Sequence, residues 1–95
     1  MQLSVIRPNL SIVVPVYNSE STLKELVGQL LSVLPKISEN FEIILVNDGS
    51  RDRSWLVIEE IQQTTRNVVG INLMRNYGQH NALLCGVRAA NHEVV

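Results

Sequence analysis

The chain has 95 residues, enough for one domain at most. Hydrophobic residues make up 45% of it, which excludes a disordered chain, and the net charge of -1 argues against nucleic acid or an anionic membrane surface as the main partner. Its one cysteine, Cys85, cannot form an internal disulfide and suits a reducing, cytoplasmic setting.

The first predicted element is a buried strand. We expect residues 1–9 to form an N-terminal extension, which lacks the apolar stretch of a signal peptide, and residues 10–95 to form the folded part. Leu10–Val16 is a short, β-branched, nearly continuous apolar run, typical of a strand covered on both faces. Pro15 lies near its end, where a missing N–H does least harm.

A helix is predicted to follow this strand. Thr22 and Glu25 have the spacing of a capping box at its start, and Pro35 is expected to end it. The apolar residues between these points follow helical spacing and form one stripe toward a core: Leu23, Leu26, Val27, Leu30, Leu31 and Leu34.

The second predicted strand, Phe41–Val46, has the same buried pattern and is broken by the turn-forming residues Asn47–Ser50. A second helix is predicted over Arg53–Thr64, with Asp52 or Ser50 as its N-cap. We therefore expect Asp52 to cap a helix rather than contact a ligand.

The last third of the chain repeats this alternation. Val68–Met74 indicates a third strand, and Arg75–His80 indicates a polar loop. A third helix has its apolar face within Ala82–Ala90, and its small residues would let it lie close on a sheet. Glu93 begins a fourth strand, which the chain leaves unfinished at Val95.

Strands that alternate with helices predict an α/β fold with a mostly parallel sheet and right-handed crossovers. Such a sheet binds ligands at the carboxyl ends of its strands. The polar residues gather at those ends, in Tyr17 and Asn18, in Asn47–Ser50 and in Arg75–His80. Trp55 and Cys85 are expected to be packing residues instead.

Three other classes of protein are weighed against these patterns. A dinucleotide-binding oxidoreductase needs Gly-x-Gly-x-x-Gly after the first strand, and this turn contains no glycine. A receiver-like module would fit the acidic turn after the second strand, but it needs further elements that this chain does not reach. An inactive α/β module that binds a nucleotide or a partner remains the alternative.

Three segments together resemble the family 2 glycosyltransferases of GT-A fold, over about residues 8–95. The third segment is most similar to the branch that transfers sugars to polyprenyl phosphates, alongside the dolichol-phosphate mannose synthases. The segments are Ile12-Val13-Val14-Pro15-Val16-Tyr17-Asn18, Ile44-Leu45-Val46-Asn47-Asp48-Gly49-Ser50-Arg51-Asp52-Arg53-Ser54 and Asn72-Leu73-Met74-Arg75-Asn76-Tyr77-Gly78-Gln79-His80-Asn81-Ala82.

The resemblance implies a nucleotide site. The turn that contains Tyr17 would line the base pocket, Asp48 would accept a hydrogen bond from the base, and Arg75 would lie near the diphosphate. Many relatives carry a second acid where Asn47 stands. The implied nucleotide-binding residues are Pro15, Tyr17, Asn18, Asp48, Gly49 and Arg75.

The resemblance also implies what lies outside the chain. The fold expected is a Rossmann-like βαβαβα half of a GT-A fold, truncated in the fourth strand. The family's Asp-x-Asp motif, which holds Mg2+ or Mn2+, and its catalytic residues are expected beyond Val95. The implied partners are a nucleotide-diphosphate sugar and a lipid-linked acceptor at the cytoplasmic membrane face. The 95-residue chain is itself expected to bind no metal, to be inactive and to self-associate along Leu10–Val16, whose neighbouring strand is only begun.

Overall fold

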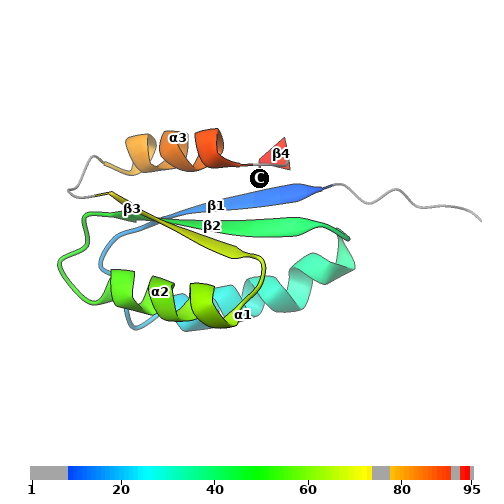
Figure 1. Cartoon of the computed structure of the whole chain (residues 1–95), viewed down its shortest axis with the longest axis horizontal. Helices are drawn as coiled ribbons and strands as arrows, with labels where there is room; N and C mark the ends of the chain where they lie inside the picture. The colour runs from blue at the N-terminus through cyan, green and yellow to red at the C-terminus, as the bar shows by residue number, and fades with distance from the viewer. Residues whose placement is uncertain (1–8, 74–77, 91–92, 95) are drawn as a thin grey trace, which may run out of the picture.

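The computed structural model describes residues 9–73, 78–90 and 93–94. Four strands alternate with helices, as the sequence predicts (Figure 1). Residues 1–8 of the predicted N-terminal extension and the end of the chain at Val95 lie outside the described residues. The elements are β1 (Leu10–Val16), α1 (Leu23–Val33), the 3-10 helix η1 (Leu34–Lys36), β2 (Phe41–Asp48), α2 (Ser54–Thr64), β3 (Val68–Leu73), α3 (Gln79–Ala89) and β4 (Glu93–Val94).

The strands form one parallel sheet in the order β3-β2-β1-β4. β1 pairs with β2 along its whole length, from Leu10 opposite Phe41 to Val16 opposite Asn47. On its other side β1 pairs with β4 only at Leu10 and Ser11. This arrangement confirms the expected α/β fold, with the first strand between the second and the fourth.

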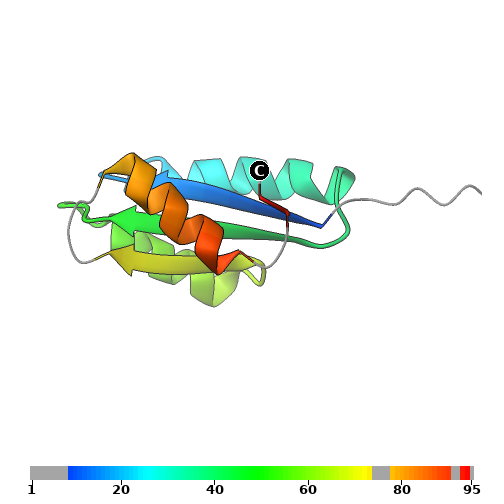
Figure 2. The ribbon, with the colours of Figure 1, turned by 90° about the horizontal axis from the view of Figure 1, so that it is seen from above.

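Helices cover both faces of the sheet. α1 and α2 lie side by side on one face, and α3 crosses the other (Figures 1 and 2). Side chains alternate along a strand, so β2 sends Ile43 and Leu45 to the α1/α2 face and Ile44 and Val46 to the α3 face. The larger core lies on the α1/α2 face, with Val16, Leu23, Val27, Leu34, Ile58, Ile61 and Val68.

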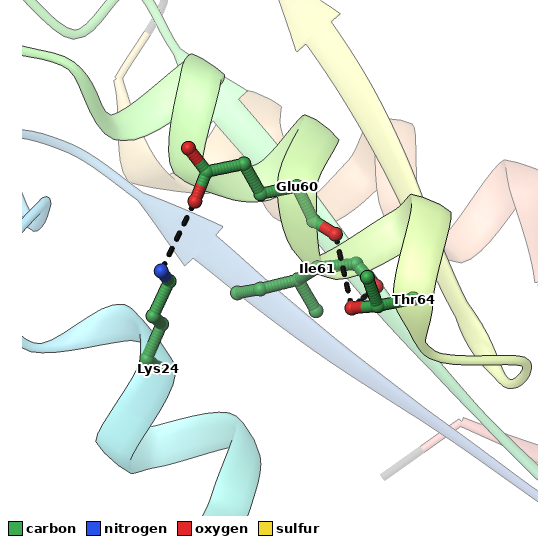
Figure 3. Close-up of polar contacts among 4 residues, drawn as sticks. All are labelled: Lys24, Glu60, Ile61 and Thr64. Carbon is green, nitrogen blue, oxygen red and sulfur yellow. Dashed lines mark hydrogen bonds and ion pairs between the residues drawn. The ribbon is translucent and has the colours of Figure 1, made fainter.

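An exposed ion pair joins α1 and α2 at the outer surface of their contact. Lys24 Nζ lies 3.0 Å from Glu60 Oε2, and Figure 3 shows this contact bridging the two helices. One turn later in α2, the Thr64 hydroxyl donates to the Glu60 carbonyl oxygen at 3.1 Å. Both charged side chains are more than 60% exposed, so water screens the attraction and the contact adds little stability.

The start and end of the first helix differ from the prediction. Thr22 occupies the N-cap position without a side-chain cap bond, and its hydroxyl instead donates to the Ser19 carbonyl oxygen at 3.3 Å. α1 ends at Val33, and Pro35 stands inside η1 instead of stopping all helical structure. Proline is tolerated there because the first residues of a helical turn need no N–H donor.

Two further boundaries were predicted wrongly. β2 continues past Val46 to Asp48, because Asn47 and Asp48 pair with β3 opposite Asn72 and Leu73. The polar loop predicted up to His80 is shorter, since α3 already begins at Gln79.

Candidate functional site

Two loops lie together at the carboxyl ends of β1 and β2. One loop, residues 17–22, follows β1, and the other, residues 49–53, follows β2. They are neighbours because the strands are parallel and end in register, with Val16 opposite Asn47. Tyr17 stands at the start of the first loop with 44% of its surface exposed, which leaves its ring free to pack against a ligand.

Asn18 joins the first loop to the second. Its backbone N–H donates to Ser50 Oγ at 3.0 Å, and its side-chain Oδ1 accepts from the Arg51 N–H at 2.8 Å. The residue adopts a left-handed conformation with φ 48°, which asparagine tolerates better than most residues. The Asn18 side chain therefore has a defined role between the loops, which sequence reasoning did not foresee.

Asp52 makes the second connection. Its Oδ1 accepts from the Ser54 N–H at 2.9 Å and from the Ser54 hydroxyl, and its Oδ2 accepts from the Glu20 N–H at 3.2 Å. Ser54 Oγ in turn accepts from the Ser19 N–H at 2.8 Å. The hydrogen bond from the Ser54 hydroxyl is the main reason that the pKa of Asp52 lies below its usual value.

The expected N-cap at Asp52 needs a correction. The N-cap of α2 is Arg53, which makes no side-chain cap bond. Asp52 lies one residue earlier and satisfies the free N–H of the first helical residue, Ser54. Ser50, the other predicted cap, accepts its bond from Asn18 instead. Both side chains thus connect the two loops, which a local capping pattern cannot predict.

The end of β2 supplies the acidic group of the site. Asp48 is 4% exposed, and Gly49 after it has φ 66°, a conformation that suits glycine. Pro15 pairs with Val46 in the neighbouring strand. β2 thus brings Asp48 and Gly49 to the edge where Tyr17 and Asn18 leave β1, while Arg75 lies outside the described residues.

Asn47 makes a polar contact that no sequence pattern predicts. Its Nδ2 donates to Asn72 Oδ1 at 2.8 Å, on the neighbouring strand β3. Asn47 is 3% exposed, and within the described part of the chain its Oδ1 has no hydrogen-bond partner. A buried acceptor of this kind is unusual, because losing water without a replacement is costly.

The other residues singled out in the sequence are structural. Trp55 packs against the core on the α1/α2 face and Cys85 against the core on the α3 face, as expected. Across residues 9–73, 78–90 and 93–94, no three His, Cys, Asp or Glu side chains gather as metal ligands would. Among the same residues, no helix combines the length and the apolar character that a membrane crossing needs.

The sequence of this chain matches a known family model. Residues 11–95 match the model described as Glycosyl transferase family 2. The undecaprenyl-phosphate 4-deoxy-4-formamido-L-arabinose transferase of Pectobacterium atrosepticum is 43% identical over 88 residues, which cover 92% of this chain and 27% of that protein. The transferase of the same name from Shewanella sediminis is 42% identical and is covered over 26% of its length. This chain thus spans about a quarter of the curated relatives that it matches.

Solved structures match with the same coverage. S. aureus TarS 1–349 superimposes with a TM-score of 0.77 and 29% identity, over 92% of this chain and 26% of that fragment. TarS has also been solved in complex with UDP and with UDP-GlcNAc. A mannosyltransferase from Pyrobaculum calidifontis has a TM-score of 0.81 over 93% of this chain and 26% of its own, and its 22% identity supports the fold alone.

Proposed function

Because this chain belongs to glycosyl transferase family 2, we propose that its protein transfers a sugar from a nucleotide-diphosphate sugar to a polyprenyl phosphate. The proposal of this acceptor rests on the 42–43% identity to transferases named for undecaprenyl phosphate. The chain spans 26–27% of those relatives, so we propose that it contributes donor binding rather than the complete reaction.

We propose that the nucleotide binds across the two joined loops. Tyr17 is exposed beside the end of β1 and can pack against a base. Asp48 stands at the end of β2, and an ionised carboxylate can accept from a base N–H. Gly49 leaves the backbone open to close approach. Asn18 shapes the first loop, Pro15 lies in β1 just before it, and Arg75 would supply a diphosphate contact.

The proposed class of donor rests on a solved structure of similar sequence. TarS, at 29% identity, has been solved with UDP and with UDP-GlcNAc. A uridine nucleotide is therefore the first candidate, and the base N–H that uracil offers suits the Asp48 carboxylate. GDP and CDP are the comparison ligands.

A divalent metal, Mg2+ or Mn2+, forms part of the proposal for the intact enzyme, where it would neutralise charge on the leaving diphosphate. The residues described in this chain do not fit such a site, since no cluster of three ligating side chains exists among them. We therefore assign its ligands to the parts of the relatives that this chain does not span. Nucleotide binding by this chain should accordingly persist when EDTA is added.

The test is calorimetric titration of the chain with UDP, GDP and CDP, with and without EDTA. We expect UDP to bind, and Asp48→Asn to weaken binding by roughly 10- to 100-fold, the equivalent of one hydrogen bond to a charged group. Glu39→Gln is the matched control, because Glu39 is an exposed carboxylate just before β2, at the opposite end of the strand. Failure of all three nucleotides to bind, or equal effects of both variants, would contradict the proposed site.

We also propose where the protein acts. A polyprenyl acceptor is confined to a membrane, whereas the loops of this chain are polar and open to water. The protein would therefore work from the cytoplasm at the membrane face, binding its donor from solution. Fractionation of cells that express the full-length protein would test this location.

Self-association of the 95-residue chain is a further part of the proposal. Within the described residues, β1 pairs with β4 only at Leu10 and Ser11, so the same edge from Ile12 to Val16 meets no strand. An unpaired apolar edge accepts strands of other molecules. We expect sedimentation to show a dimer or larger species at high concentration. A monomer at high concentration would contradict the idea.

A further inference from the structure

The hydrogen bonds between the two loops form a directed chain. The Ser19 N–H donates to Ser54 Oγ, and the Ser54 hydroxyl donates to Asp52 Oδ1. Since Asp52 is an acceptor when ionised, the direction of each bond is fixed. The second oxygen of the same carboxylate accepts from the Glu20 N–H at 3.2 Å. One carboxylate thus fixes two consecutive amides of the other loop, one directly and one through Ser54.

The Asn18 contacts reinforce the same connection at a second point. The Asn18 N–H donates to Ser50 Oγ and the Asn18 side chain accepts from the Arg51 N–H. Amides of residues 18–20 are therefore satisfied by side chains of residues 50–54, and the Arg51 amide is satisfied from residue 18. Ser54 is fully buried, so its part of this connection is shielded from competing water.

The connected residues flank the proposed nucleotide site without being the residues assigned to the base. Tyr17 immediately precedes residues 18–20, whose amides are bonded to the second loop, and Asp48 immediately precedes the second loop. The register of β1 and β2 brings Tyr17 and Asp48 near each other, and the bonds between the loops restrict how far the backbone after Tyr17 can move. A site that is already in its binding geometry loses less conformational entropy when the ligand arrives.

We infer that Asp52 is a positioning residue for nucleotide binding: through Ser54 and the amides of Ser19 and Glu20, it holds the loop of Tyr17 at a fixed place relative to Asp48. This inference rests on the proposed function, because it assigns Asp52 a part in the affinity for the nucleotide. It goes beyond helix capping, which would require only the bond to the Ser54 N–H.

The capping and positioning roles can be separated by variants. Ser54→Ala removes the hydroxyl that accepts from the Ser19 N–H but leaves the Ser54 N–H. The bond from this N–H to Asp52, at the start of α2, can therefore still form. Asp52→Ala removes the bonds that the carboxylate accepts from the Ser54 N–H, the Ser54 hydroxyl and the Glu20 N–H. Asp52→Asn keeps one acceptor oxygen and replaces the other with an NH2 group, so either the two bonds from Ser54 or the one bond from Glu20 can survive, but not all three. Thr64→Ala is the control on α2, because it removes a hydroxyl bond at the far end of that helix.

The experiment is calorimetric titration of each variant with UDP, together with its melting temperature, well below which the titration is run. We expect Asp52→Ala and Ser54→Ala each to raise the UDP dissociation constant about fivefold or more. Asp52→Asn should fall between wild type and Asp52→Ala. Thr64→Ala should leave the dissociation constant unchanged, whatever its effect on the melting temperature.

The outcomes distinguish the inference from the function on which it rests. If wild type binds UDP and Ser54→Ala binds equally well, the inference is wrong and the proposed function stands. If Asp52→Ala melts earlier but keeps the wild-type dissociation constant, Asp52 only begins a helix and the inference is again wrong. If wild type binds none of UDP, GDP and CDP, the proposed function fails and the inference fails with it.

Discussion

The two faces of the sheet are packed in different ways. On the α1/α2 face, two helices bury large aliphatic side chains such as Leu23 and Ile58, and the separation of the layers is set by the bulk of those residues. On the α3 face, one helix approaches closely, because Gly86 stands where a side chain would meet the sheet. The first face buries the larger aliphatic core, and on the second a helical glycine lets α3 pack directly against the sheet.

A glycine lies at a tight contact between helix and sheet on each face. A Cβ added at Gly86, in α3, would lie 2.2 Å from Val13 Cγ1 in β1. A Cβ added at Gly70, in β3, would lie 2.5 Å from Ile58 Cγ2 in α2. One glycine therefore belongs to the helix and the other to the sheet. The packing of each helical layer on the sheet therefore requires one residue that has no side chain.

The largest effect is expected for Gly86→Ala. The new Cβ would overlap a branched side chain in the central strand β1 and would lie 3.1 Å from Val46 Cγ2. We expect a loss of about 3 kcal/mol in the free energy of unfolding, the upper part of the range for overpacked cores, measured by urea denaturation. Adding Val13→Ala should restore part of the loss, since it removes the overlapping methyl groups. Equal stability of Gly86→Ala and wild type would show that α3 is not held at this distance.

A smaller loss is expected for Gly70→Ala, about 2 kcal/mol. β3 is the outer strand of the sheet, and part of the overlap involves Gln62 Oε1, the end of a flexible side chain, at 2.8 Å. The same Gln62 Oε1 accepts from the Gly70 N–H at 3.0 Å, and its displacement would expose that amide. Urea denaturation beside Gly86→Ala gives the ranking directly. A larger loss at Gly70 would reverse the comparison of the two faces.

Gly28→Ala should change stability in the opposite direction. Gly28 lies in α1, and an added Cβ would have no neighbour within 4 Å. Alanine restricts the unfolded chain and favours a helix, so a gain of about 1 kcal/mol is expected. The melting temperature of this variant is the control for the other two glycines. A loss of stability here would mean that chain entropy does not dominate at this position.

The smallest effect is expected for Lys24→Ala. The Lys24–Glu60 ion pair is exposed at the outer surface of the α1/α2 face, away from the aliphatic core that holds the two helices together. We expect a loss below about 0.5 kcal/mol that disappears at 1 M salt. A loss of several times that size would show that charge, and not buried volume, joins α1 to α2.

The sequence predicts most of this fold because its signals are local. Leu10–Val16 has the same bounds in the structure as in the prediction, since an apolar β-branched run followed by polar residues allows few other structures. The small residues predicted to bring the third helix close to the sheet include Gly86, which does so. The boundaries at Pro35 and Val46 were less predictable, because strand pairing and helix tightening depend on the neighbouring elements.

The location of the candidate site could be predicted from the sequence, but the hydrogen bonds that connect its two loops could not. The positions of Tyr17 and Asp48 follow from strands that end in polar turns. The hydrogen bonds of Asn18 and Asp52 join residues more than 30 positions apart, and a capping pattern concerns only adjacent residues. The hydrogen bond between Asn47 and Asn72 could not be predicted, because the register between β2 and β3 decides which residues lie opposite each other.

The position of β2 in the sheet has a consequence for how the chain opens. β2 is paired on both sides, and every residue from Glu42 to Asp48 is buried. Its successive backbone amides face β1 and β3 in turn, so all of them exchange their hydrogens with solvent only when both neighbouring strands separate, which amounts to unfolding of the domain. In deuterium oxide, β2 should keep its hydrogens longest, and its exchange rate should report the stability of the whole domain.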